Sequence, residues 1–167
     1  GARTSGASRK GAANADADPG GRQLFERLLL ASADAASRAD CDPAALSAHA
    51  EAAFRFIGEK PKSGHRVGVR EALPIAAGSS AGPVTVLEMV NDDMPFLLDS
   101  VLGEVQARGL VPSLILHPIL KTRRDAAGRL EAVTAAGDRD WGDGRQESYI
   151  SLHLDALEAE ERDGLAA

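Results

Sequence analysis

The segment VTVLEMVN, residues 84–91, restricts the possible folds more than any other part of the chain. It is apolar on nearly both faces of an extended backbone, which is typical of a central strand that is covered on two sides. After the turn residues NDDMP, Leu98, Val101, Leu102 and Val105 recur at the i, i+3, i+4 and i+7 positions. This spacing predicts an amphipathic helix, and we expect all four side chains to be buried. The chain therefore needs a buried strand that leads directly into a helix.

Three other segments alternate between apolar and polar residues with the period of two that marks strands. They are HRVGVREAL (65–73), LVPSLILHPILKTRRD (110–125) and ESYISLHLD (147–155). The turn residues DAAG at 125–128 predict a hairpin that returns through RLEAV. A short helix is expected to begin at Asp155 and to run to Gly164.

One face of these strands has a different expected role. Val111, Ile115 and Ile119 alternate with the leucines of their segment, and Tyr149 alternates with Ile150 in the last strand. We expect these four to share a sheet surface that docks on another domain or subunit.

The N-terminal part divides into two regions. Residues 1–22 contain no large apolar side chain, so we expect a disordered tail. Residues 23–60 form a helical segment whose second helix has Asp42 as N-cap and Pro43 at its first position. In that helix a stripe of four apolar residues should face the core: Leu46, Ala50, Ala53 and Ile57.

The order strand, helix, two strands, helix predicts an α+β fold of the ferredoxin-like type, with an antiparallel sheet and helices on one face, over residues 65–167. A complete unit needs one more strand. Either HRVGVREAL fills that place in the sheet, or the last strand lies beyond residue 167 and the domain is truncated. We favour the first arrangement.

Composition narrows the classes of function. The 167 residues carry a formal net charge of -6 and one cysteine, Cys41. Scattered basic residues argue against nucleic acid as a partner, and no apolar run is long enough for a membrane span. A single cysteine and the absence of a secretory signal favour a soluble, cytoplasmic protein. The chain starts at Gly1, which suggests a piece of a longer polypeptide.

Few residues of this sequence point to catalysis or to metal binding. Asp92 and Asp93 could ligate a hard metal, but a carboxylate before Met94 and Pro95 is more simply the N-cap of the following helix. His117 and His153 fall on the same face of their strands, yet two imidazoles make a poor zinc site. No phosphate-binding glycine loop occurs. We predict no catalytic, cofactor or metal site in this chain.

The stretch VTVLEMVNDDMPFLLDSVLGEVQARGLVPSLILHPILKTRRD resembles the N-terminal region of the large, bacterial-type NAD-dependent glutamate dehydrogenases. The resemblance covers residues 42–160, and residues 87–101 are its most specific part. It implies an ACT-type domain that is itself non-catalytic. The parent enzyme would convert L-glutamate, NAD and water to 2-oxoglutarate, ammonia and NADH, with NAD bound far downstream.

Two functions follow from the resemblance. The domain is either a regulatory or assembly module that contacts downstream domains in a homo-oligomer, or an amino-acid sensor that binds a small effector at the strand-to-helix turn. Phe96 stands where ACT modules that bind amino acids have a glycine, which favours the first function. The effector residues that the second function implies are Asn91, Asp92, Asp93, Met94, Phe96 and Leu97.

Overall fold

The structure is a computed structural model that describes residues 19–61, 64–77, 82–142 and 144–167. Three helices come first: α1 (Pro19–Ala31), α2 (Ala35–Ala39) and α3 (Pro43–Ile57). The strands are β1 (His65–Ala72), β2 (Val84–Asp92), β3 (Leu114–Leu116), β4 (Ile119–Arg124), β5 (Leu130–Ala135) and β6 (Arg145–Leu154). Helix α4 (Leu97–Ala107) connects β2 to β3, and α5 (Ala159–Ala166) follows β6.

The strands form one antiparallel sheet in the order β1-β2-β6-β4-β5, and β3 also pairs with β6. Strand β1 therefore lies beside β2 at the edge, in the place that a strand after α5 would take. The predicted α+β fold and its antiparallel sheet are confirmed. Strands β3 and β4 pair with successive parts of β6, and Pro118, which has no backbone N–H to donate, lies between them.

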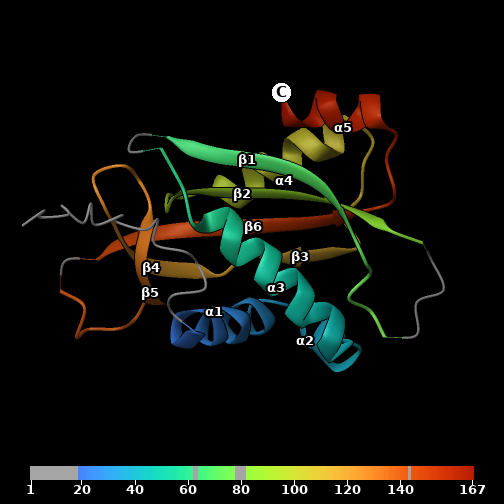
Figure 1. Ribbon diagram of the computed structural model, residues 1–167. Coiled ribbons are helices and arrows are strands. Elements are labelled where there is room, and N and C mark those ends of the chain that lie inside the picture. Colours follow the sequence, from blue (N-terminus) through green and yellow to red (C-terminus); the bar gives the residue numbers. More distant parts are fainter. Residues whose placement is uncertain (1–18, 62–63, 78–81, 143) are drawn as a thin grey trace, which may run out of the picture.

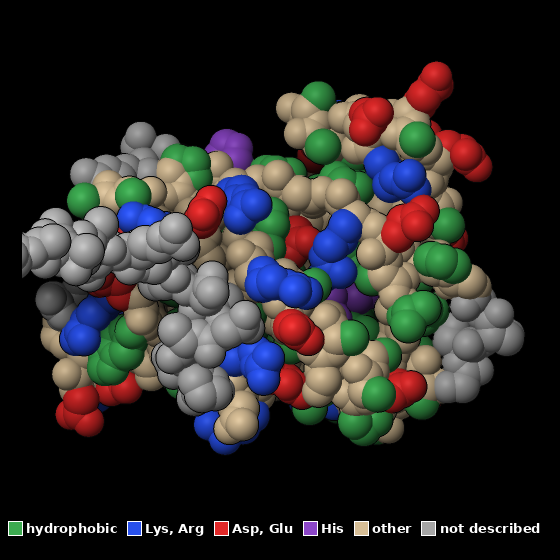
Figure 2. Space-filling model, viewed as in Figure 1, with side chains coloured by type: hydrophobic (Ala, Val, Ile, Leu, Met, Phe, Trp, Pro, Cys, Tyr) green, Lys and Arg blue, Asp and Glu red, His purple; other side chains and the backbone are tan. Residues whose placement is uncertain are grey.

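Helices cover both faces of the sheet. Figure 1 shows α3 crossing in front of the strands with α1 below it, while α4 and α5 lie together on the other side. The helices of the ferredoxin-like unit thus share one face, as predicted, and the N-terminal helices cover the opposite one. We call these the α4 face and the α3 face. Figure 2, in the same view as Figure 1, shows acidic and basic side chains interspersed over the α3 side, with apolar ones scattered between them.

The α3 face holds the larger core cluster. Phe25 of α1 and Phe54 of α3 have ring centroids 5.7 Å apart, and Phe25 also contacts Tyr149 of β6 edge to face. The helix stripe predicted from the sequence is confirmed, because Leu46, Ala50, Ala53 and Ile57 are all buried. Asp42 caps α3 by accepting from the N–H groups of Ala44 and Ala45.

The predicted docking surface is wrong. Ile115 pairs with Leu152, so it faces α4, whereas Tyr149 faces α3 and is fully buried. A strand register cannot be read from one strand alone, and a shift of one residue exchanges the two faces. Val111 lies in the loop before β3 and is exposed.

The helix α4 is less buried than its pattern predicts. Of the four apolar side chains, only Val105 is buried, and Leu98, Val101 and Leu102 are half-buried. The short helix α5 covers the same face and leaves much of the α4 stripe in contact with solvent.

Helix and turn boundaries differ in detail from the predictions. Residues 1–18 of the expected tail lie outside the described residues, and α1 already includes Pro19–Arg22. The expected first helix breaks in two because Asp34 accepts from the N–H of Ser37 and starts α2. Helix α5 begins at Ala159 rather than at Asp155.

The β4–β5 hairpin holds the end of α3. The predicted turn at 125–128 is present, and Gly128 has a left-handed φ of 86°. A Cβ there would come within 1.9 Å of the Lys60 carbonyl oxygen, so only glycine fits. The N–H of Lys60 donates to the Gly128 carbonyl at 3.0 Å. None of the described helices combines the length and the apolar character needed to cross a membrane.

The two faces should differ in their share of the stability. Phe54→Ala removes a buried ring from the α3 face and is expected to lower the free energy of unfolding by about 3–5 kcal/mol. Leu98→Ala on the half-buried α4 stripe should cost only about 1 kcal/mol. Urea denaturation of both variants measures the difference, and equal losses would contradict this assignment of the core.

Candidate functional site

The predicted effector residues lie on the turn between β2 and α4. Strand β2 ends at Asp92, and α4 starts at Leu97, which is half-buried. Phe96 stands at the N-cap position in the left-handed region, with φ 63° and ψ 11°, and no side chain caps the helix. Its ring does not fill the turn, because Phe96 is 77% exposed and Met94 is 48% exposed.

The two carboxylates of this turn contact other parts of the chain. Asp92 lies 3.2 Å from the Lys60 ammonium and 4.0 Å from the Arg145 guanidinium. Asp93 accepts a 2.8 Å hydrogen bond from Ser148 of β6. Asn91 Oδ1 accepts from the N–H of Asp92. The side chains of the turn thus attach it to β6 and to the end of α3.

The predicted N-cap is wrong. Asp93 is three residues ahead of Phe96, and its carboxylate turns to β6 instead of to α4. Both aspartates make other contacts inside the fold, Asp92 with Lys60 and Asp93 with Ser148.

His117 and His153 are not neighbours. His117 lies between β3 and β4, and its Nε2 is 3.2 Å from the Ser148 hydroxyl, on the α4 face. Burial lowers the pKa of His117, and the charge of Asp93 opposes that shift. His153 faces α3 instead. Among the described residues, no group of three His, Cys, Asp or Glu side chains could hold a metal ion.

A buried polar cluster on the α3 face was missed from the sequence. Glu88 of β2 accepts from Arg70 of β1 at 2.6 Å and from the Tyr149 hydroxyl at 3.1 Å. Arg70 also reaches His49 Nδ1 at 2.7 Å. His49 Nε2 lies 3.2 Å from the Ser151 hydroxyl.

The sequence did contain a signal for this cluster. His49 lies on the apolar stripe of α3, three residues after Leu46, and Glu88 interrupts the apolar run of β2. A polar residue on a buried face needs a buried partner. The sequence could not show which residues would supply that partner.

Burial controls the ionisation of the cluster. It lowers the pKa of His49 to about 2, and the nearby His153 and Arg70 act in the same direction. It lowers the pKa of His153 to about 4, again with a contribution from Arg70. Burial raises the pKa of Glu88, although Arg70 opposes that shift. Both histidines are therefore neutral at pH 7.

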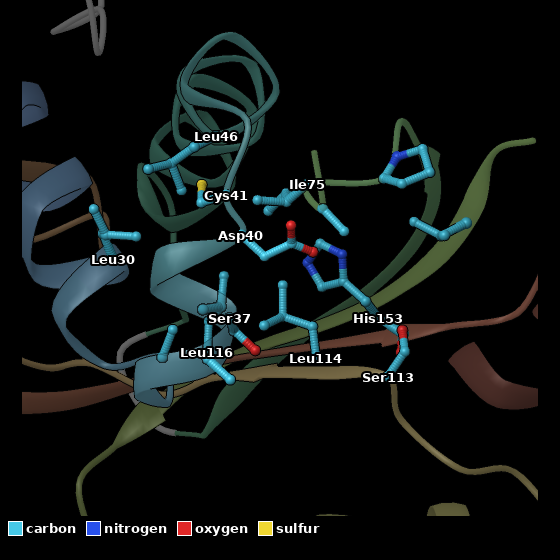
Figure 3. Close-up of a pocket in the computed structure, with 15 residues that line it drawn as sticks. Leu30, Ser37, Asp40, Cys41, Leu46, Ile75, Ser113, Leu114, Leu116 and His153 are labelled. Atoms are coloured by element: carbon cyan, nitrogen blue, oxygen red, sulfur yellow. The ribbon is translucent and has the colours of Figure 1, made fainter. Parts of the chain in front are cut away.

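A cavity of about 370 Å³ opens beside this cluster (Figure 3). It lies between α2, the segment before β2, and strands β3 and β6. Its walls are mainly apolar, and His153, Asp40, Ser37 and Ser113 contribute the polar side chains. Cys41 also lines it, and burial raises the pKa of that thiol.

Comparisons with known proteins agree with the resemblance. The family described as "Glutamate dehydrogenase, ACT1 domain" matches residues 25–167. Proteins named NAD-specific glutamate dehydrogenase, from Halomonas elongata and from Pseudomonas aeruginosa, are each 35% identical over 71 residues. Each match covers 42% of this chain and 4% of the relative, so the chain spans a small part of the length of these relatives. No solved structure matches the chain significantly.

The depressed histidine pKa values predict a loss of stability in acid. Below pH 6.5, His153 binds a proton in the unfolded chain, whereas in the folded chain it stays neutral until about pH 4. The free energy of unfolding therefore falls as the pH is lowered. Between pH 7 and pH 5, His153 alone should account for about 2 kcal/mol of the loss. Glu88 acts in the opposite direction, because its raised pKa lets the folded state bind a proton first.

His153→Phe should therefore reduce the loss of stability between pH 7 and pH 5 by about 2 kcal/mol, as measured by urea denaturation at several pH values. The contribution of His49 remains in this variant. His65→Gln is the control, since His65 is exposed. If His153→Phe loses as much stability on acidification as the unmodified chain, the assignment is incorrect.

Proposed function

Because the chain belongs to the glutamate dehydrogenase ACT1 domain family, we propose that it is the non-catalytic N-terminal ACT-type domain of an NAD-dependent glutamate dehydrogenase and that it serves in assembly of the enzyme. The parent polypeptide would oxidise L-glutamate with NAD and water to 2-oxoglutarate, ammonia and NADH in the cytoplasm. Its NAD site would lie in downstream domains. The partners of this domain are those downstream domains within a homo-oligomer.

The observation that carries the assembly role is the exposed apolar turn before α4. Only Pro95 separates Met94 from Phe96, and both side chains are exposed. Phe96 also holds a left-handed backbone, which costs a non-glycine residue about 1–2 kcal/mol. Burial against a partner would recover apolar contact that the separate domain lacks, at about 25 cal/mol per Å².

The surroundings of the turn fit a docking element. Lys60, Arg145 and Ser148 hold Asp92 and Asp93 from the side of the sheet, so the turn has a fixed position from which Phe96 projects. The half-buried apolar stripe of α4 follows directly after this turn, on the α4 face of the sheet. A downstream domain of the parent chain is the partner we assign, because the relatives are many times longer than the matched segment.

Phe96→Asn tests the assembly role. Asparagine accepts a left-handed backbone and removes the apolar ring, so the domain should keep its stability. In the full-length enzyme we expect a shift toward smaller species by analytical ultracentrifugation. The control is Val111→Asn, which changes a residue that is 80% exposed at the other end of α4. Unchanged assembly of the Phe96 variant would refute the role of this turn.

One observation favours the alternative, amino-acid sensing. A groove of about 630 Å³ runs between β1, β2 and α4, and Asn91 and Leu97 line it beside the uncapped start of α4. Unpaired N–H groups at a helix start attract carboxylates. Of the other four residues assigned to the effector, Asp92 and Asp93 are held by contacts inside the fold, and Met94 and Phe96 are exposed.

Calorimetric titration of the chain with the twenty amino acids tests the alternative. Sensing predicts saturable heat for one of them, lost in Asn91→Ala and retained in Glu131→Gln, which alters an exposed residue of β5. Assembly without sensing predicts no heat for any of them.

A further inference from the structure

The cavity beside α2 is separate from the turn that carries the proposed function. It lies on the α3 face of the sheet, whereas the groove at Asn91 and Leu97 lies on the α4 face. Leu30, Leu46, Ile75, Leu114 and Leu116 supply most of its apolar wall. A volume of about 370 Å³ falls within the range of sites that hold small organic ligands.

His153 lines this cavity and carries a ring nitrogen that has no partner among the described residues. The residue is only 2% exposed, and its Nε2 has no hydrogen-bond partner among the described residues. Its backbone is satisfied, because its carbonyl accepts from the N–H and the hydroxyl of Ser113. The other side of the ring packs against His49, with centroids 4.8 Å apart. A buried polar atom without a protein partner is unusual in a folded protein, and a bound ligand or an ordered water can supply the bond.

The polar groups of the cavity accept hydrogen bonds from a cation. Figure 3 shows the side chains of Asp40 and His153 converging on one end of the cavity, away from Leu30. With its proton on Nδ1, neutral His153 offers Nε2 as an acceptor. A carboxylate and an imidazole acceptor together suit the three donors of a primary ammonium group.

The same cavity disfavours anions. Among the described residues, no lysine or arginine lines it. The start of α3 is nearby in sequence, but Asp42 already accepts from its free N–H groups. Arg70, whose charge acts on His153, is already paired with Glu88 at 2.6 Å. A carboxylate or phosphate would therefore meet the carboxylate of Asp40 without a compensating cation among the described lining residues, which opposes binding at short range.

We propose that this cavity binds a small, apolar primary amine, with its ammonium group between Asp40 and His153 Nε2 and its apolar body among the leucines. The inference does not depend on the assembly role. It also differs from amino-acid sensing, because an α-amino acid carries a carboxylate for which the cavity has no partner.

Three probes of the same shape test the charge preference: 2-phenylethylamine, 2-phenylethanol and 3-phenylpropanoate. Calorimetric titration of the chain should show the amine binding about tenfold tighter than the alcohol, as a charge-assisted hydrogen bond implies. The carboxylate should bind at least tenfold more weakly than the amine. The same is expected for phenylalanine, a fourth probe that carries both an ammonium group and a carboxylate. Equal binding of all probes, or no binding of the amine at millimolar concentration, overturns the proposal.

Variants locate the binding. Asp40→Asn should weaken the amine about tenfold and leave the alcohol unchanged. Ala36→Trp places a bulky ring at the rim on α2 and should block every probe. His153→Phe removes the unpaired nitrogen and should weaken both the amine and the alcohol. Asp99→Asn on α4 is the control with unchanged affinity.

A spectroscopic readout separates binding from folding. The chain has four histidines, so the ring signals of His153 can be assigned by comparison with the His153→Phe spectrum. The amine should shift the Nε2 signal of His153 and leave that of His65 unchanged. A shift at His65 without one at His153 would place the probe elsewhere and overturn the proposal.

Discussion

The structure depends on one constraint, which is that β6 is buried on both faces while its α3 face is polar. Every residue on that face of the strand from position 147 onward carries a polar group: Glu147, Tyr149, Ser151 and His153. A buried polar atom without a partner costs about 1–3 kcal/mol. Glu147, Tyr149 and Ser151 are each matched by a neighbour, whereas His153 Nε2 has no partner among the described residues. Arg124 binds Glu147 with two hydrogen bonds, Glu88 accepts from Tyr149, and His49 contacts Ser151. These partners come from β4, β2 and α3, and they fix where β6 sits among these three elements.

This row of polar contacts explains why the N-terminal helices belong to the fold. Helix α3 supplies an apolar stripe and one polar residue, His49, at the point where Ser151 and Arg70 need it. An apolar helix could slide along the sheet at little cost, whereas a helix with one buried polar contact has a preferred position. The hairpin reinforces that position by bonding Gly128 to Lys60 at the end of α3. Packing supplies most of the free energy on this face, and the polar contacts select one arrangement.

Local patterns predicted the elements well, and they failed where two elements had to be matched. The capped start and apolar stripe of α3 depend only on residues within one helix, and both were predicted from the sequence. The pairing of Ile115 with Leu152 depends on a register between strands 37 residues apart, which no local pattern contains. The half-exposure of α4 depends on how little of it α5 covers. The cavity at His153 was missed for the same reason, since its walls come from five separate segments.

The two candidate binding places lie on opposite faces of the same pair of strands. Asn91 and Asp92 end β2 opposite Ser148 and Glu147, while His153 lies near the other end of β6, opposite Val86. The pairing between β2 and β6 is continuous over this whole distance, so the strands connect the two places as one rigid unit. A ligand at His153 would also contact α2 and residues 74–76, and backbone bonds from Asp42 to Ile75 and from Ala77 to Asp40 join the residues after α2 to that segment. Its first contacts would therefore be with those segments, toward the end of β6 that lies away from the turn at Phe96.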